Sequence, residues 1–166
     1  MPSNNPVISN NTPLVALSVL NQLDLLAKLF GTILIPPAVY EEFTATESIA
    51  RQIAFENAPW LQITQLDSPQ HALAFAGLDK GEAEVLALAQ EKQARLVIID
   101  ERRGRRYAQR LRLSLTGTLG VLLLAKERNL LPFIEPSIAK LQQEGLYLSP
   151  ALVAQVLNLA GESQSK

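Results

Sequence analysis

Four polar side chains stand where an α/β protein commonly places its chemistry. Asn10 follows the apolar run "PVIS", and Asp100 ends the apolar run "RLVIID". Glu42 and Glu82 lie in the first turns of the helical patterns "PPAVYEEF" and "GEAEVLALAQEKQ", and both project beside apolar stripes. Carboxylate and amide oxygens without His or Cys suit Mg²⁺ or Mn²⁺. If the fold brings these positions together, the sequence predicts a divalent-cation site.

Such a cluster would be electrostatically costly on its own. Two carboxylates about 4 Å apart repel by roughly 4 kcal/mol at an effective dielectric constant near 20, so the acids need protons or a cation. A cation there would polarise a phosphate and lower the pKa of a bound water. Phosphodiester hydrolysis is therefore the chemistry that the predicted cluster suits.

Helix capping is the alternative explanation for each acid. In "DKGE", Asp79 is placed to cap a helix with Glu82 three residues later, which is a capping-box pattern. Acids in a first turn, such as Glu42, also interact favourably with the helix dipole. Asp100 can begin a turn or cap a helix, and Glu101 beside it is expected to point elsewhere and to be exposed. The acids Glu41, Glu84 and Glu91 are expected on solvent-facing sides of their helices.

A block of arginines follows Asp100 directly. It holds Arg102, Arg103, Arg105, Arg106, Arg110 and Arg112. Guanidinium groups pair with phosphates, so the block could hold a nucleic-acid backbone near a metal, and Tyr107 could add base stacking. The alternative is a solvated helix face with salt bridges to neighbouring acids.

Other site chemistries find little support. The chain has no Cys, and its one His, His71, has no partner at metal-ligand spacing and is expected to be structural. No phosphate-binding glycine fingerprint is present. The hydroxyl of Thr118, after "LSLTG", could face the same cleft, or it could serve as a helix cap.

Short β-branched runs alternate with longer helical patterns along the chain. Strands are predicted in "PVIS", "TILI", "WLQITQL", "RLVIID" and "LSLTGT". Helices are predicted through "LVALSVL" after a Thr12 cap, "LDLLAKLF", "PPAVYEEF", "TESIARQIAFENA", "GEAEVLALAQEKQ", 118–129 and 149–160. This alternation predicts an α/β domain with three layers, α/β/α, around a mostly parallel sheet. Sites in such sheets gather at the carboxyl ends of strands, where Asn10 and Asp100 are expected.

Composition sets the class of protein. With 166 residues, 48% hydrophobic content and a net charge of −1, the chain is expected to form a single domain over 1–166. The longest apolar runs are too short to span a bilayer, and the start of the chain lacks the basic and apolar regions of a signal peptide. We expect a cytoplasmic protein without a membrane partner.

The motifs and their order resemble the PIN-domain family, in particular its bacterial and archaeal branch of nucleic-acid-binding proteins. The motifs are "VISNNTPLVAL", "LDLLAKLFGTILIPPAVYEEF", "LDKGEAEVLALA", "LVIIDERRGRR", "LTGTLGVLLLAK" and "LAGE", which span about residues 6–162. The resemblance implies a three-layer α/β/α fold. It also implies a Mg²⁺- or Mn²⁺-dependent ribonuclease, as in VapC-type toxins, whose activity a small antitoxin protein inhibits. Such toxins are often homodimers, so the resemblance makes a homodimer possible here.

The resemblance implies roles for single residues as well. Glu42, Glu82 and Asp100 match acidic metal-site positions, and Thr12 matches a hydroxyl near the first acid. Asn10 stands where the family has its first aspartate. An amide oxygen can bind a metal, but it brings no charge and cannot act as a base. Three hypotheses follow: a ribonuclease with a weakened metal site, an inert PIN-like module that binds RNA or a protein, and a structural domain whose acids are all caps.

Overall fold

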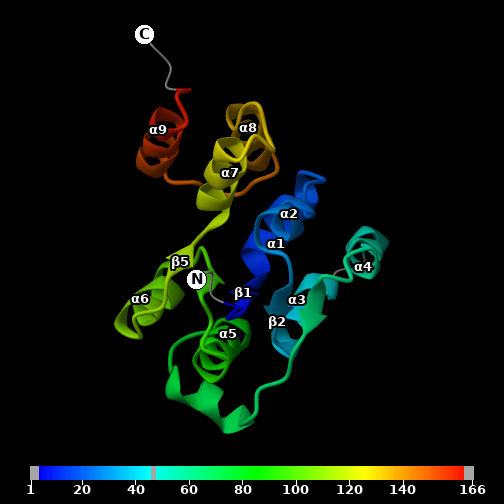
Figure 1. Cartoon of the computed structure of the whole chain (residues 1–166), viewed down its shortest axis with the longest axis vertical. Helices are drawn as coiled ribbons and strands as arrows, with labels where there is room; N and C mark the ends of the chain where they lie inside the picture. Colours follow the sequence, from blue (N-terminus) through cyan, green and yellow to red (C-terminus); the bar gives the residue numbers. More distant parts are fainter. Residues whose placement is uncertain (1–3, 46–47, 163–166) are drawn as a thin grey trace.

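Five parallel strands form the centre of the molecule (Figure 1). The computed structural model describes residues 4–45 and 48–162. The strands are β1 (Val7–Ser9), β2 (Ile33–Ile35), β3 (Leu61–Ile63), β4 (Leu96–Ile98) and β5 (Leu115–Thr116), in the order β3-β2-β1-β4-β5. All neighbouring pairs run parallel, as the alternating sequence pattern predicts.

Helices cover both faces of this sheet. They are α1 (Asn11–Val19), α2 (Leu25–Phe30), α3 (Pro37–Thr44), α4 (Ile49–Glu56), the 3₁₀ helix η1 (Pro69–Ala74), α5 (Lys80–Glu91), α6 (Arg102–Arg110), α7 (Thr118–Glu127), α8 (Glu135–Gln143) and α9 (Pro150–Leu159). Figure 1 shows α1, α2 and α7 on one side of the strands and α5 and α6 on the other. The three-layer α/β/α prediction is confirmed. The predicted helix "TESIARQIAFENA" forms α4, and its residues 46 and 47 lie outside the described part.

The central strands are buried on both faces. Val7 and Ile8 of β1 and Val97 and Ile98 of β4 have no exposed surface, which explains why these strands read as continuous apolar runs rather than alternating ones. No helix in residues 4–45 and 48–162 is long and apolar enough to cross a bilayer.

The strand order determines where polar chemistry can gather. The chain passes from β1 outward to β2 and β3, then returns to place β4 on the other side of β1. Ser9 pairs with Ile98, and the Asn10 N–H donates to the Ile98 carbonyl at 2.9 Å. The carboxyl ends of β1 and β4 are therefore adjacent, at the point where the strand order reverses.

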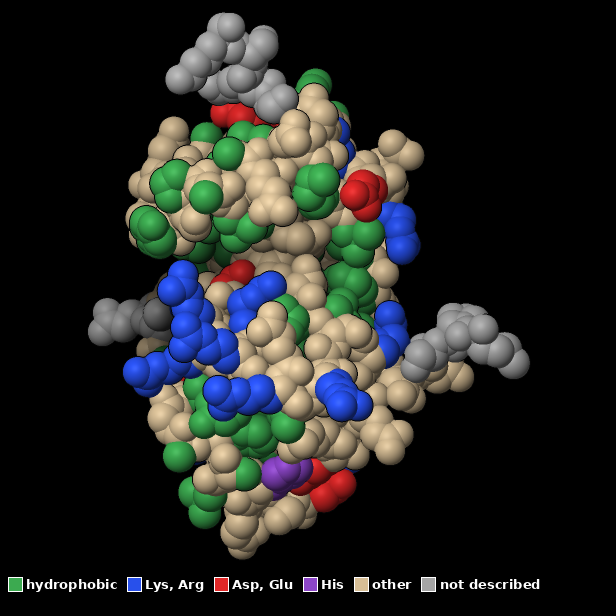
Figure 2. Space-filling view, turned by 90° about the vertical axis from the view of Figure 1, so that its left-hand side faces the viewer, with side chains coloured by type: hydrophobic (Ala, Val, Ile, Leu, Met, Phe, Trp, Pro, Cys, Tyr) green, Lys and Arg blue, Asp and Glu red, His purple; other side chains and the backbone are tan. Residues whose placement is uncertain are grey.

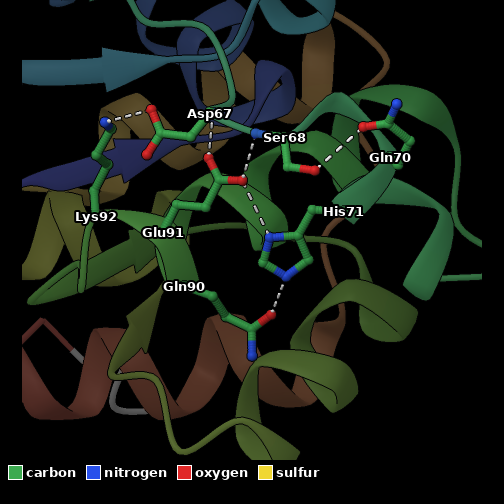
Figure 3. A network of polar contacts seen from close by, with 7 residues as sticks. All are labelled: Asp67, Ser68, Gln70, His71, Gln90, Glu91 and Lys92. Atoms are coloured by element: carbon green, nitrogen blue, oxygen red, sulfur yellow. Dashed lines mark hydrogen bonds and ion pairs between the residues drawn. The ribbon is translucent and has the colours of Figure 1, made fainter.

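Glu91, at the end of α5, holds the loop before η1 in place. The Glu91 carboxylate accepts the N–H groups of Asp67 and Ser68 and contacts the His71 ring, which also meets Gln90 (Figure 3). Burial opposes the charge of Glu91, but these hydrogen bonds outweigh it and lower the pKa of the carboxyl. The expectation that Glu91 faces solvent is wrong, since its side chain is only 10% exposed. His71 is structural, as predicted.

Glu84 and the closing "LAGE" motif show the same use of carboxylates. Glu84 was expected to face solvent, but it accepts the Ala38 N–H in the first turn of α3. Glu162 accepts the N–H groups of Ile134 and Glu135 at the start of α8 and pairs with Lys126 at 2.8 Å. It thereby ties the end of the described chain to α7 and α8.

Substitution of Glu91 tests this anchoring. Glu91→Gln should lower the free energy of unfolding at pH 7 by about 1–3 kcal/mol, because two amides lose a charged acceptor. Since the folded pKa is depressed, the difference should be present above the pKa of the unfolded chain and should disappear as the pH falls through the folded pKa. Urea unfolding at several pH values measures it, with Glu144→Gln at an exposed position as control. Equal stability of the two variants would contradict the anchoring.

Candidate functional site

Glu101 is the acid that connects the ends of β1 and β4. Its carboxylate accepts the Asn10 side-chain amide at 2.9 Å through one oxygen and the Thr12 hydroxyl through the other. The expectation that Glu101 is exposed and points elsewhere is therefore wrong: it is half-buried and faces β1. Strand β4 ends at Ile98, so strand alternation no longer sets side-chain direction at Asp100 and Glu101.

Thr12 has a different place from the one expected. The residue that precedes α1 is Asn10, and Thr12 lies inside the first turn with Pro13 next to it. The Thr12 hydroxyl is thus free of a capping role and donates to Glu101. Asn10 is only 4% exposed, so its contact with Glu101 lies largely away from water.

Asp100 contacts the start of α7 instead of the end of β1. Its two oxygens accept the Thr118 N–H at 2.8 Å and the Thr118 hydroxyl at 2.6 Å, which caps the start of α7. A Cβ at Gly117 would lie 2.3 Å from Asp100 Oδ1, so the close approach requires glycine there. Burial raises the pKa of Asp100 although these hydrogen bonds oppose it. The alternatives predicted from the sequence, an Asp100 cap on the following helix or a Thr118 cap, are therefore wrong in detail: Glu101 precedes α6, Gly117 precedes α7, and Asp100 caps α7 from another element.

Glu82 is a buried acid among other acids. It lies in the first turn of α5, and its backbone N–H donates to the Asp79 carboxylate at 2.8 Å, which is the helix cap that the "DKGE" pattern predicts. Glu82 is 7% exposed. Burial first, and then the nearby charges of Asp79, Glu101 and Glu42, raise the pKa of Glu82 to about 7. Near neutral pH this carboxyl is divided between its protonated and charged forms.

Glu42 reaches the same place from α3. A Cβ at Gly81 would lie 2.3 Å from Glu42 Oε1, so this glycine admits the Glu42 carboxylate against the first turn of α5. Burial raises the pKa of Glu42, and the charges of Asp79 and Glu101 raise it further. Glu42 and Glu82 therefore both lie close enough to Glu101 to feel its negative charge.

The chemistry of these donors fits a divalent cation. Burial destabilises the charged forms of Glu42 and Glu82, and the negative charge of Glu101 adds to this effect at both. A bound cation would relieve both effects. In the part of the chain that the structure describes, no three acidic or histidine side chains converge on one point closely enough to hold a metal ion.

The arginines of α6 divide between two environments. Arg105 donates to the Ile99 carbonyl at 2.8 Å and lies near Asp100, whereas Arg103 donates to the Gly77 carbonyl at 3.0 Å. Arg102 and Arg106 are exposed. Among residues 4–45 and 48–162, none of the arginines of the block forms a salt bridge, so the alternative of a salt-bridged helix face finds no support.

The raised pKa of Glu82 predicts a pH dependence of stability. Between about pH 4.5 and 7 the folded protein binds the Glu82 proton more tightly than the unfolded chain does. The free energy of unfolding should therefore fall as the pH rises through this window. Glu82→Gln should remove this fall and exceed the wild type at pH 8 by up to about 3 kcal/mol. Chemical unfolding between pH 4.5 and 8 measures the free energy of unfolding, with Glu41→Gln as the net-charge control. The same pH profile in Glu82→Gln as in the wild type would refute the prediction.

Comparison with known proteins bears on this arrangement. No curated protein matches the chain. The model of the family DUF3368, described as a PIN domain, matches residues 6–162. This match spans nearly the whole chain, and the five-stranded parallel sheet between helical layers agrees with it. The chain belongs to the PIN-domain family.

Proposed function

We propose that this protein is a Mg²⁺- or Mn²⁺-dependent ribonuclease whose site lies at the carboxyl ends of β1 and β4. The observation that carries the proposal is the position of Glu101. It joins Asn10 and Thr12 of the first strand–helix turn to the acids Glu42 and Glu82 in one electrostatic cluster. The PIN-domain family supports a nuclease-type fold and nucleic-acid binding.

Each side chain has a role in this proposal. Glu42, Glu82 and Glu101 would hold the ion, together with the amide oxygen of Asn10. When bound, the ion supplies a polarised phosphate and a more acidic water. Asn10 and Thr12 orient Glu101 through their hydrogen bonds. Glu82, with a pKa of about 7, can hold or release a proton near neutral pH.

Asp100 has a positioning role in the same proposal. Its carboxylate holds the start of α7 through Thr118, and the charge of Arg105 favours its ionised form. The sequence predicted Asp100 as a metal ligand and Thr118 as a nucleic-acid contact; here they would act by fixing the edge on which Glu101 stands. Arg102, which is exposed at the first turn of α6, would offset phosphate charge.

A second candidate is an inert module that binds RNA. It is favoured by the two hydrogen bonds that already engage both Glu101 oxygens, and by the neutral amide at Asn10. With one negative charge fewer, the cluster binds a cation less tightly. The two candidates share the RNA ligand and differ in metal binding and cleavage.

Cleavage of RNA distinguishes the candidates. A mixed pool of single-stranded RNA with Mn²⁺ should be cut slowly by the wild type and faster by Asn10→Asp. Cutting should be lost in Glu101→Gln and in Glu82→Gln, because each replaces a negatively charged metal ligand with a neutral amide. Gel analysis of the products measures it, with Glu41→Gln as the matched acid-to-amide control. RNA binding without cleavage in every variant would favour the inert module and reject the ribonuclease.

Metal binding gives a readout that does not depend on cleavage. Without metal, Asn10→Asp should be less stable than the wild type by about 1–3 kcal/mol, because Glu101 loses a donor and faces a like charge. Mn²⁺ should raise the melting temperature of both proteins, and more so for Asn10→Asp, since a ligand bound only by the folded state stabilises it. Thermal unfolding with millimolar Mn²⁺ or EDTA measures this. Identical curves with and without Mn²⁺ in both proteins would exclude a metal site.

The sequence also predicts a toxin-like role, a cytoplasmic location, a small antitoxin-type partner and a homodimer. A groove of about 450 Å³ between α8 and α9, lined by Ile138, Val153 and Leu157 among others, would suit a protein contact. Leu152 and Leu159 are exposed on α9 beside it. Light scattering on the purified chain would test the homodimer, and a monomer at all concentrations would reject it.

A further inference from the structure

A surface pocket of about 240 Å³ lies against the outer side of α6. Three arginines, Arg103, Arg106 and Arg110, line it together with Tyr107 and the loop 76–78. Figure 2 shows this face, with Lys and Arg side chains gathered over an apolar area. None of the residues that line the pocket belongs to the acid cluster, and nothing in the proposed cleavage chemistry uses the pocket.

The spacing along α6 brings these side chains together. Residues three and four positions apart share one face of a helix, and Arg103, Arg106, Tyr107 and Arg110 follow that spacing. Arg105 points elsewhere, to the Ile99 carbonyl. The helix therefore presents three guanidinium groups to one place, where they repel one another.

Ion pairs among the described residues do not neutralise this positive charge. Within the described residues, none of the three arginines of the pocket forms a salt bridge. Arg106 is exposed, and Arg103 donates one N–H to the Gly77 carbonyl. Most of the guanidinium N–H groups are thus available to an anion, and phosphate is the anion that their planar geometry matches.

Tyr107 gives the pocket an aromatic wall, and neighbouring residues contact both its hydroxyl and its ring. The Tyr107 hydroxyl donates to the Ala76 carbonyl at 3.0 Å, and its ring packs edge-on against Phe75 with 5.7 Å between centroids. The Arg110 guanidinium lies over the same ring at 5.7 Å from its centroid. A flat base can stack on such a guanidinium–tyrosine pair, while the apolar loop covers its edge.

The pocket adjoins the acid cluster. The loop 76–78 leads directly into Asp79, and a Cβ at Gly104, next to Arg103, would lie 3.7 Å from Glu82 Oε2. A single strand seated in the pocket could therefore continue toward Glu82. The volume is below the roughly 300–1,000 Å³ of sites for drug-sized ligands, which limits it to one nucleotide.

We propose that this pocket binds one unpaired nucleotide of an RNA strand, with its phosphate on Arg103, Arg106 and Arg110 and its base against Arg110 and Tyr107. The proposal takes its ligand class from the proposed function, but it concerns binding alone. Because binding is measured in EDTA, it can be observed even if the protein does not cleave RNA. Conversely, a pocket that does not bind RNA would not contradict metal-dependent cleavage.

Fluorescence anisotropy with a labelled eight-nucleotide single-stranded RNA in EDTA tests the pocket. The double variant Arg106→Gln/Arg110→Gln should raise Kd on the order of 10- to 100-fold and flatten its salt dependence by about one unit per lost phosphate contact. Arg128→Gln, an exposed arginine outside the pocket, is the control for the loss of a surface positive charge and should stay within about twofold. Thermal unfolding verifies that each variant is folded.

Competition identifies the ligand. A nucleoside monophosphate should displace the labelled RNA, whereas inorganic phosphate at equal ionic strength should not, and a fully paired RNA of the same length should bind more weakly. The proposal is overturned if the double variant binds like the wild type or if Arg128→Gln weakens binding equally. If inorganic phosphate competes as well as the nucleoside monophosphate, the pocket binds anions without recognising a base. If paired RNA binds as tightly as single-stranded RNA, the pocket does not bind an unpaired base.

Discussion

The pairing of β1 with β4 is the constraint on which the rest of the site depends. Ser9 pairs with Ile98, and the next amide, that of Asn10, donates to the Ile98 carbonyl. These bonds lie in the middle of a sheet buried on both faces, where an unmade backbone bond would be costly. They place the residues after each strand within hydrogen-bond distance, and the contact between Asn10 and Glu101 follows directly.

The neutral amide at Asn10 changes the electrostatics of this edge. An amide donates to the Glu101 carboxylate, so the two side chains attract without a cation between them. Among the described residues, no side chain donates such a hydrogen bond to Glu42 or Glu82, and burial and nearby negative charges raise their pKa values. The charge of Glu101 is therefore stabilised by hydrogen bonds within the protein, whereas Glu42 and Glu82 favour a proton or a cation.

Glycines decide how closely the carboxylates approach the backbone. Gly81 admits Glu42 to the start of α5, and Gly117 admits Asp100 to the start of α7; a side chain at either position would overlap a carboxylate oxygen. Gly104 likewise packs against Ile99 and lies beside Glu82. Since these three glycines all lie near helix N-terminal turns, α5, α6 and α7 can bring their first turns to the same sheet edge.

The sequence by itself determined the parallel α/β sheet, the edge at which polar residues gather, the Asp79 cap and the inward side of Glu42 and Glu82. These follow from apolar periodicity, which is a local property of strands and helices. Only the tertiary structure decided that Glu101, rather than Asp100, faces Asn10, because β4 ends two residues earlier than its apolar run suggests. It also decided that Glu84 and Glu91 hold backbone amides, since a helical projection carries no information about which loop folds back over a polar face.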